Sequence, residues 1–433
     1  MKSQYSLRWI LILCFVFVLF SNCSDKCVVT NSYVYYEPVF STSAEIKASI
    51  GFRPPQSISS AGKIYFKDDI LFINEIGDGI HIIDNQNPAS PVPLGFLNIP
   101  GNYDLSIINN ILYADSYVDL VVFDISNLQD IKEVHRVEGL FNHYNSLGFY
   151  ADSVKGIVTD WKEVGHVSIE ENDCTTQYEN WGGFYRGTGV VFSDAAASAF
   201  NAKAAINPGG TTTGIGGSLA RFTIANNFLY AIDSYSLDIV DVTFPSSPKA
   251  KTEIPLGWLP ETLFPYNGNL FIGTRLGMQI FDLATPESPA LLSTFSHVLS
   301  CDPVVVEGDY AYVTLFTGNT CNQGVNELQV INIKDLTAPT LVKTYPMTSP
   351  HGLGIDNGTL FVCDGTDGLK VYNASDVYKI KENQLAHYKE MNAIDIIPFK
   401  NIAMMISEDG LYQYDYSDIQ NIRLLSKIAI DKQ

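Results

Sequence analysis

The sequence is poor in basic residues for its length. It has 27 Lys and Arg against 47 Asp and Glu among 433 residues, which gives a formal net charge of −20 at pH 7. Such an acidic chain repels nucleic acid and anionic lipid headgroups. We therefore expect no nucleic-acid partner. The negative field favours solubility, attraction of cations or binding of a neutral ligand.

Catalytic and cofactor motifs are also missing. The sequence contains neither a G-x-S-x-G nor an H-E-x-x-H pattern. The Gly pair at residues 209–210 does not follow a strand and open a helix, so it predicts no phosphate loop. Residues 77–79 and 364–368 resemble fragments of calcium loops, but ordinary β-turn chemistry explains them without a metal. We identify no cofactor from the sequence, and a divalent cation stays an open alternative.

The longest apolar run near the N-terminus covers residues 9–20, which is too short to span a bilayer and typical of a signal-peptide core. It follows Lys2 and Arg8 and is followed by Ser21, Asn22 and Cys23. This ending resembles the bacterial lipobox, in which the Cys is lipidated after cleavage. We expect residues 1–22 to be a signal peptide and Cys23 to be the lipidation site. The alternative is a secreted protein without lipid on Cys23.

From this signal peptide and lipidation site we expect a protein of the bacterial cell envelope. It would be held by lipid in the outer membrane and face the periplasm or the surface. Residues 23–60 then form an anchor tether and an N-terminal strand. We expect an outer-type strand at residues 44–50.

A short apolar strand closed by Asp, at residues 237–241, recurs through most of the chain. We call the closing residues the marker residues, and most are spaced by 40 to 42 residues. The long interval from Asp124 to Asp241 leaves room for a degenerate unit at residues 164–170. This period is typical of propellers and solenoids and indicates eight units. The marker residues are Asp84, Asp124, Asp241, Asp282, Asn332, Asn373 and Asp415.

Each unit has the same internal order. Two apolar runs flank a tight polar turn, such as Asn109-Asn110, which is hairpin chemistry. Pro residues four or seven positions past a marker separate the third apolar run from a fourth, outer run, because Pro cannot donate a hydrogen bond to a neighbouring strand. The pattern predicts an all-β chain: a β-propeller at residues 61–433 with eight blades, or alternatively seven, of four-stranded antiparallel sheets. The last outer strand is expected at residues 422–430, and the only helix at residues 195–205.

The repeated strand at residues 237–241 and its copies resemble the LVIVD repeat of bacterial lipoproteins, mostly from Bacteroidota. The resemblance covers roughly residue 62 to the C-terminus. It implies a propeller fold and an envelope location. It transfers no catalytic residue, because no activity is established for that family.

Residues 171–217 interrupt the repeat with an aromatic and Gly-rich insertion. A long insertion in a repeat protein is usually functional or disordered. Its aromatic residues, among them Trp181 and Tyr185, favour contact with a partner. The alternative is that the insertion packs back on the ring and covers a degenerate blade.

Three Cys residues of the repeat region carry predictions. Cys301 precedes the first strand of its unit and Cys321 lies in the loop after the second strand, so both belong to one face of the propeller. We predict a disulfide bond between them, which an extracytoplasmic location permits. Cys363 lies in an apolar strand and is expected to be a buried thiol.

Polar residues precede the inner strands, where propellers often bind ligands at the mouth of the central channel. Such a ring either keeps the mouth hydrated or forms a site for a small molecule or cation. His351 and Asp302 would suit acid–base chemistry, but no nucleophile accompanies them. The residues are Lys63, Tyr103, Asp104, His143, Arg221, Glu261, Asp302 and His351.

We therefore expect a non-enzymatic binding or scaffolding lipoprotein. It is attached to the membrane through its lipid anchor and recognises a protein or glycan partner. The alternative is an extracytoplasmic lyase or hydrolase with a polar site at the channel mouth, so the sequence leaves open whether the protein is an enzyme.

Overall fold

The computed structural model describes residues 29–141, 148–171, 213–233, 235–257, 259–297, 303–317 and 325–431, with the side chains of residues 29–33 and 167–171 excepted. The chain divides into two compact units, residues 1–37 with 162–193 and residues 38–161 with 194–433. The described part of the first unit consists of portions of β1 (Val29–Ser41) and β12 (Gly156–Glu171), which pair in one sheet. The second unit contains the repeats.

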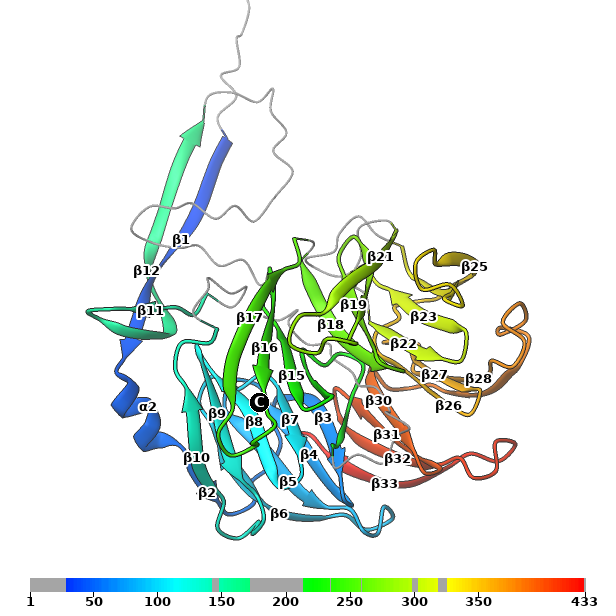
Figure 1. Cartoon of the computed structure of the whole chain (residues 1–433), viewed down its shortest axis with the longest axis horizontal. Coiled ribbons are helices and arrows are strands. Elements are labelled where there is room, and N and C mark those ends of the chain that lie inside the picture. The colour runs from blue at the N-terminus through cyan, green and yellow to red at the C-terminus, as the bar shows by residue number, and fades with distance from the viewer. Residues whose placement is uncertain are drawn as a thin grey trace, which may run out of the picture. The chain divides into compact units, whose positions relative to one another are not determined.

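Seven sheets of the second unit contain four antiparallel strands in chain order, and we number these blades 1 to 7 (Figure 1). Blade 1 has a strand added on each side, β13 (Ile215–Gly216) on β3 and β2 (Gly51–Arg53) on β6. The first three blades are β3 (Ala61–Lys67), β4 (Ile70–Glu75), β5 (Gly79–Asp84) and β6 (Val92–Asn98); β7 (Leu105–Ile108), β8 (Ile111–Ser116), β9 (Asp119–Asp124) and β10 (Lys132–Val137); and β14 (Phe222–Ala225), β15 (Phe228–Ile232), β16 (Ser236–Asp241) and β17 (Lys249–Pro255).

The other four blades follow without a break in the chain order. They are β18 (Pro260–Tyr266), β19 (Asn269–Thr274), β20 (Gly277–Asp282) and β21 (Ala290–Ser296); β22 (Val304–Glu307), β23 (Tyr310–Leu315), β24 (Glu327–Asn332) and β25 (Thr340–Pro346); β26 (Leu353–Asp356), β27 (Thr359–Cys363), β28 (Leu369–Asn373) and β29 (Gln384–Tyr388); and β30 (Ala393–Phe399), β31 (Ile402–Ser407), β32 (Gly410–Asp415) and β33 (Arg423–Ala429).

The blades close into a ring, because the inner strand of each blade contacts the inner strand of the next from β3 to β30. A buried cluster that includes Ile64 and Ile73 of blade 1 with Ile397 and Met404 of blade 7 joins the two ends. The predicted β-propeller is confirmed. Within the described residues the chain forms eight sheets, as many as the units counted in the sequence. Seven of these pack as the ring, which is the alternative blade count.

The eighth sheet has three strands in the order β1, β12 and β11 (Ala151–Asp152). It includes residues 164–170, where the sequence predicted a degenerate unit. Blade 2 packs directly on blade 3 through a cluster that contains Leu120, Val122, Leu229 and Val240. In chain order β11 and β12 are therefore inserted between blades 2 and 3, and β1, which precedes blade 1, pairs with β12.

The marker residues have a single structural role in all seven blades. The side-chain Oδ1 of each accepts a hydrogen bond from the backbone N–H two residues later, at 2.8 to 3.0 Å. This Asx turn reverses the chain after the third strand. Asp and Asn are interchangeable here because both present the same acceptor oxygen. At Asp415, bonds from Ser417 and Arg423 lower the pKa of the carboxyl to about 2.

Hydroxyl groups tie most blades to the next one, and we call these bonds the hydroxyl latches. In each, a Tyr or Ser side chain donates to a backbone carbonyl in the following blade, and most acceptors lie four residues past a marker. Pro is accepted at that position because only its carbonyl is used. The six pairs are Tyr113–Pro245 (2.7 Å), Tyr230–Pro286 (2.8 Å), Ser293–Leu336 (2.6 Å), Tyr345–Val377 (2.6 Å), Tyr388–Ile422 (2.7 Å) and Ser426–Pro88 (2.6 Å).

One expected strand is wrong. Residues 44–50 were predicted as an outer strand, but most of them belong to α2 (Ser43–Ser49), a short helix. Thr42 and Glu45 form a reciprocal capping box that starts this helix, a local signal stronger than the alternation of its few apolar residues. The outer strand on blade 1 is β2 instead, whereas the last outer strand, β33, lies where it was expected.

Cys363 is fully buried in β27, as predicted. The predicted lipidation site Cys23, the Cys301–Cys321 bond and the helix at residues 195–205 lie outside the described residues. Over the described ranges, the chain has no helix with the length and apolar character required to cross a bilayer.

Candidate functional site

One residue of each blade occupies the same place at the inner end of the ring. It stands four residues before the last residue of the inner strand, and we call it the mouth position. Lys63, Asp104 and Arg221 were predicted there and occupy it. Glu261 and His351 lie one residue earlier. A shift of one residue turns a side chain toward the other face of a strand. The mouth residues are Lys63, Asp104, Arg221, Thr262, Pro303, Gly352 and Asp395.

The centre of the ring is filled by residues 213–220, which we call the plug segment. It contacts the inner strands of five blades before the chain enters blade 3. Ser218, Leu219 and Ala220 are buried. The contacts are Gly214 N to Ile107 O (3.2 Å), the pairing of Ile215 with Phe66, Gly217 N to Ile64 O (2.9 Å), Leu353 N to Ser218 Oγ (3.0 Å), Ser218 Oγ to Asp395 Oδ1 (3.3 Å) and Leu263 N to Ala220 O (2.8 Å).

The plug segment fills the crevice beside Lys63 and Asp104. The crevice between Lys63, Tyr65, Asp104 and the plug segment has no room for a sphere the size of a water molecule. Small residues permit this fit, since a Cβ on Gly214 would lie 2.2 Å from the ring of Tyr65. For residues 213–217, the end of the insertion, packing back on the ring is the observed arrangement.

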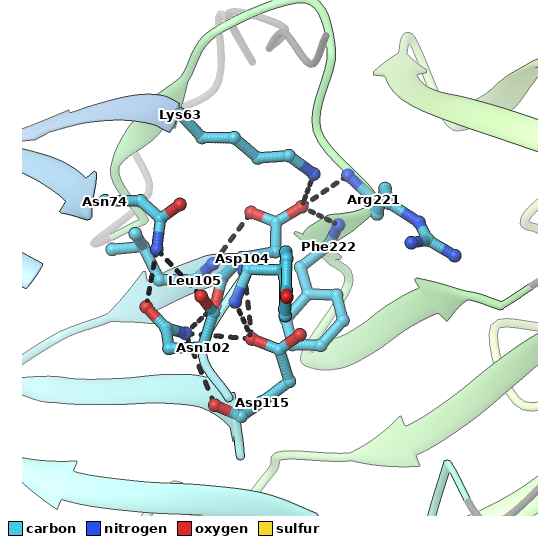
Figure 2. A network of polar contacts seen from close by, with 9 residues as sticks. Lys63, Asn74, Asn102, Asp104, Leu105, Asp115, Arg221 and Phe222 are labelled. Atoms are coloured by element: carbon cyan, nitrogen blue, oxygen red, sulfur yellow. Dashed lines mark hydrogen bonds and ion pairs between the residues drawn. The ribbon is translucent and has the colours of Figure 1, made fainter. Parts of the chain in front are cut away.

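Asp104 is the centre of the polar network at the mouth (Figure 2). Its Oδ2 accepts from Lys63 Nζ at 2.6 Å and from the backbone N–H groups of Arg221 at 2.6 Å and Phe222 at 3.1 Å. Its Oδ1 accepts from Leu105 N at 2.7 Å. The carboxylate thus joins the inner strands of blades 1, 2 and 3 and is fully used in the fold.

Lys63 is the cation of this network, and only 9% of its surface is exposed. Burial lowers the pKa of Lys63, and Arg221 acts in the same direction, while Asp104 opposes both. Figure 2 shows the backbone of Arg221 turned toward Asp104 and its guanidinium directed away from it. The mouth therefore carries a buried ion pair rather than a solvated ring.

A second carboxylate, Asp115, fixes the chain that leads into blade 2. Its Oδ1 accepts from Tyr103 N at 2.8 Å, Asp104 N at 2.9 Å and Asn102 Nδ2 at 2.8 Å. Asn102 in turn accepts from Asn74 of blade 1 at 2.8 Å. Burial raises the pKa of Asp115 to about 6. Sequence analysis missed Asp115, Asn74 and the mouth residue Asp395, although the repeat offset could have found the last.

Two other predicted residues that the structure describes, Glu261 and His351, each have a separate partner. Glu261 forms an ion pair with Arg275 at 2.7 Å. The His351 ring packs on Phe316 with centroids 4.3 Å apart, and burial lowers the pKa of His351 to about 4, so the imidazole is neutral at pH 7. Glu261, His351 and Asp104 belong to blades 4, 6 and 2 respectively.

The remaining candidates, His143, Trp181, Tyr185 and Asp302, lie outside the described residues. In the described part of the chain, no group of three His, Cys, Asp or Glu side chains is arranged to hold a metal ion. Among the described residues, the hydrogen bonds at the mouth hold the inner strands of neighbouring blades together.

The chain is a β-propeller that carries LVIVD repeats. The LVIVD repeat model matches residues 103–138, 216–254 and 300–347, which fall on blades 2, 3 and 5. No curated protein has a detectably similar sequence.

Several solved structures are similar to this chain at low sequence identity. The computationally designed Ika8 protein is 10% identical over 88% of this chain and 91% of its own, with a TM-score of 0.51. Hsv2 of Kluyveromyces lactis is 11% identical over 86% of this chain and 100% of its own, with a TM-score of 0.48. A protein from Lactobacillus plantarum is 10% identical over 83% and 96%, with a TM-score of 0.45.

Proposed function

We propose that the protein is a lipid-anchored propeller of the bacterial cell envelope that binds or scaffolds a protein or glycan partner without catalysing a reaction. The anchor is Cys23, and the propeller is extracytoplasmic. The observation that carries this proposal is the plugged centre of the ring, with Asp104 fully used by internal hydrogen bonds. A site for small-molecule chemistry needs open space, and the crevice between Lys63, Tyr65 and Asp104 has no room for a sphere the size of a water molecule.

Partner contact is then expected on the outer surface. The net charge of −20 favours a neutral or cationic partner surface over nucleic acid. The sequence supports the insertion as the contact region through Trp181 and Tyr185, since rigid aromatic side chains supply large contact area to both proteins and glycans. The insertion continues directly into the plug segment, so its C-terminal end is fixed in the ring.

The anchor is tested by replacing Cys23 with Ala and fractionating cells. The variant should lose membrane attachment, while Cys27→Ala, a Cys four residues further along, should keep it. Attachment of Cys23→Ala equal to that of the unchanged protein would show that the anchor lies elsewhere.

The binding function is tested with the chain that starts after residue 22, on glycan arrays and by capture of envelope proteins. Deleting residues 181–187 should abolish capture and leave the thermal stability of the ring unchanged. His351→Gln should leave capture unchanged, because His351 packs inside the ring. A substrate panel for lyase and hydrolase activity runs in parallel. Turnover that disappears in His351→Gln would overturn the binding model in favour of the enzyme alternative.

A further inference from the structure

Two positions of the repeat form a buried pair of ionisable side chains in blades 1 and 6. One is the residue at the end of the second strand, and the other lies three residues before the marker in the third strand. In blade 6, Lys370 Nζ contacts the carboxylate of Asp364, which is fully buried. In blade 1, His81 Nε2 lies 2.8 Å from Glu75 Oε2, and both residues are buried. Each buried carboxylate therefore faces a group that can carry a positive charge.

Blade 3 has carboxylates at both positions. Asp233 stands at the end of the second strand and Asp238 three residues before the marker Asp241. The strand register is the same as in blade 6, because Asp238 pairs with Ala231 as Lys370 pairs with Val362. The place of the blade 6 ammonium is thus taken by a second acid.

A third carboxylate lies on the same face. Glu253 on β17 pairs with Asp238, at the position that His387 occupies opposite Lys370 in blade 6. Cross-strand partners of an antiparallel pair share one face of the sheet. Blade 3 therefore presents three acidic side chains where blade 6 presents an acid, a Lys and a His.

Asp238 is the buried member of this group of three acidic residues. The residue is only 5% exposed, and its Oδ2 has no hydrogen-bond partner within the described structure. Burial, reinforced by Asp233 and Glu253, raises the pKa of Asp238 to about 8. A buried carboxylate without a partner is costly, so native proteins rarely keep one without a ligand or a proton.

The neighbouring groups cannot supply the missing cation. Lys251 on β17 pairs with Asp241 at 3.2 Å and lies 3.9 Å from Glu287. Val240, on the same face as Asp238, packs against apolar residues of blade 2 that include Leu120 and Val122. Asp233 uses Oδ1 for the N–H groups of Tyr235 and Ser236 and for the Ser236 hydroxyl, which leaves its Oδ2 for a ligand.

We propose that blade 3 binds a divalent cation of the calcium class between Asp233 and Asp238, with Glu253 completing the carboxylate set. Carboxylate oxygens are the ligands that calcium prefers, and its geometry tolerates both single and paired oxygens. The three carboxylates are not arranged as a ready metal-binding group in the described structure, so the proposed site requires their side chains to turn toward the ion. Glu253 lies on the exposed outer strand β17. This site is additional to the partner binding proposed above.

The test uses the chain that starts after residue 22, freed of metals with a chelator. Calcium chloride and magnesium chloride are titrated by calorimetry at pH 7.5, and thermal unfolding is recorded with and without each. Calcium should bind saturably at one site and raise the unfolding temperature. Asp238→Asn should weaken binding by at least about tenfold, as expected for the loss of one charged ligand. The control Glu287→Gln, outside the three carboxylates, should keep full affinity.

Asp238→Lys provides a variant that should remain folded, because it copies the Lys370–Asp364 pair of blade 6. In the presence of chelator it should unfold at a higher temperature than the original chain. Calcium should no longer change its unfolding temperature. The proposal is overturned if the original chain binds no calcium up to millimolar concentration, or if Asp238→Asn binds it with unchanged affinity. In that case Asp238 keeps a proton instead, and stability follows pH alone.

Discussion

Removing the carboxylate of Asp104 should destabilise the ring strongly, because four donors depend on it. Lys63, 9% exposed, would lose its counter-ion, and the N–H groups of Leu105, Arg221 and Phe222 would lose their acceptor. Breaking a buried ion pair from one side costs about 3–5 kcal/mol. An orphaned buried N–H adds roughly 1–3 kcal/mol, and these costs overlap. We expect Asp104→Ala to lose on the order of 4 kcal/mol of unfolding free energy.

The effect of the partner variant should be smaller. Lys63→Met leaves the Asp104 carboxylate with three backbone donors, so its charge stays solvated by the protein. Asp104→Asn keeps the acceptor oxygen. Its loss of unfolding free energy should fall between those of Asp104→Ala and Lys63→Met. The double variant Lys63→Met with Asp104→Asn should be more stable than the sum of the single effects predicts, because neither charge is then left alone.

The assay is urea unfolding followed by tyrosine fluorescence and circular dichroism, with midpoints compared at equal slope. Asp130→Asn serves as a control, since Asp130 and Lys132 form an exposed pair at 2.7 Å and should contribute nothing measurable. A loss below about 1 kcal/mol in Asp104→Ala would refute the reasoning, because it would mean that the carboxylate is not required by the fold. Asp104 would then return as a candidate ligand group.

Four further outcomes are expected. Tyr230→Phe removes one hydroxyl latch and should cost about 1 kcal/mol in a urea titration. Burial lowers the pKa of His351 to about 4. In the unfolded chain His351 takes up a proton below about pH 6.5, whereas in the folded chain its imidazole stays neutral down to about pH 4. The unfolding free energy that the neutral His351 contributes is therefore lost as pH falls from 6.5 toward 4. His351→Phe should flatten that slope in thermal scans. Gly214→Val should lower the unfolding temperature, because a Cβ there overlaps an aromatic ring of blade 1. Non-reducing peptide mapping should recover Cys301 and Cys321 as one linked pair.

Each of these has a matched comparison. Tyr235→Phe, at an exposed tyrosine of the same blade, should leave the midpoint unchanged. Gly165→Val meets no atom within 4 Å and should be neutral in the same thermal scan. An unchanged pH slope in His351→Phe would assign the acid sensitivity to other groups, and two separate Cys301 and Cys321 peptides would exclude the disulfide.

The repeated features could be predicted from the sequence because their causes are local. The marker residues act on the N–H group two positions later, and Asn109-Asn110 forms a hairpin turn in which Asn109 takes a positive φ of 52°. Seven repetitions of such local rules determine the strand order. Cys363 was predicted correctly for a similar reason, since an apolar strand between two hairpins is buried.

The site could not be predicted because the contacts that form it join residues far apart in the sequence. Ser218 of the plug segment bonds to Leu353 and Asp395, residues more than a hundred positions away. The mouth position in blade 4 was assigned to Glu261 rather than Thr262. A bulge between Pro260 and Thr262 interrupts the pairing there, and period-two alternation does not reveal an inserted residue.

The hydroxyl latches make the order of the blades independent of where the chain begins. Each latched blade holds the next by the same kind of bond, and Ser426 to Pro88 joins the last blade to the first. Ile58 and Ile430 lie side by side as a parallel bridge, so the two ends of the ring are already neighbours. A circularly permuted chain, cut in another outer loop and joined here, would keep every interface between blades. The contacts between blades therefore give the ring no preferred beginning.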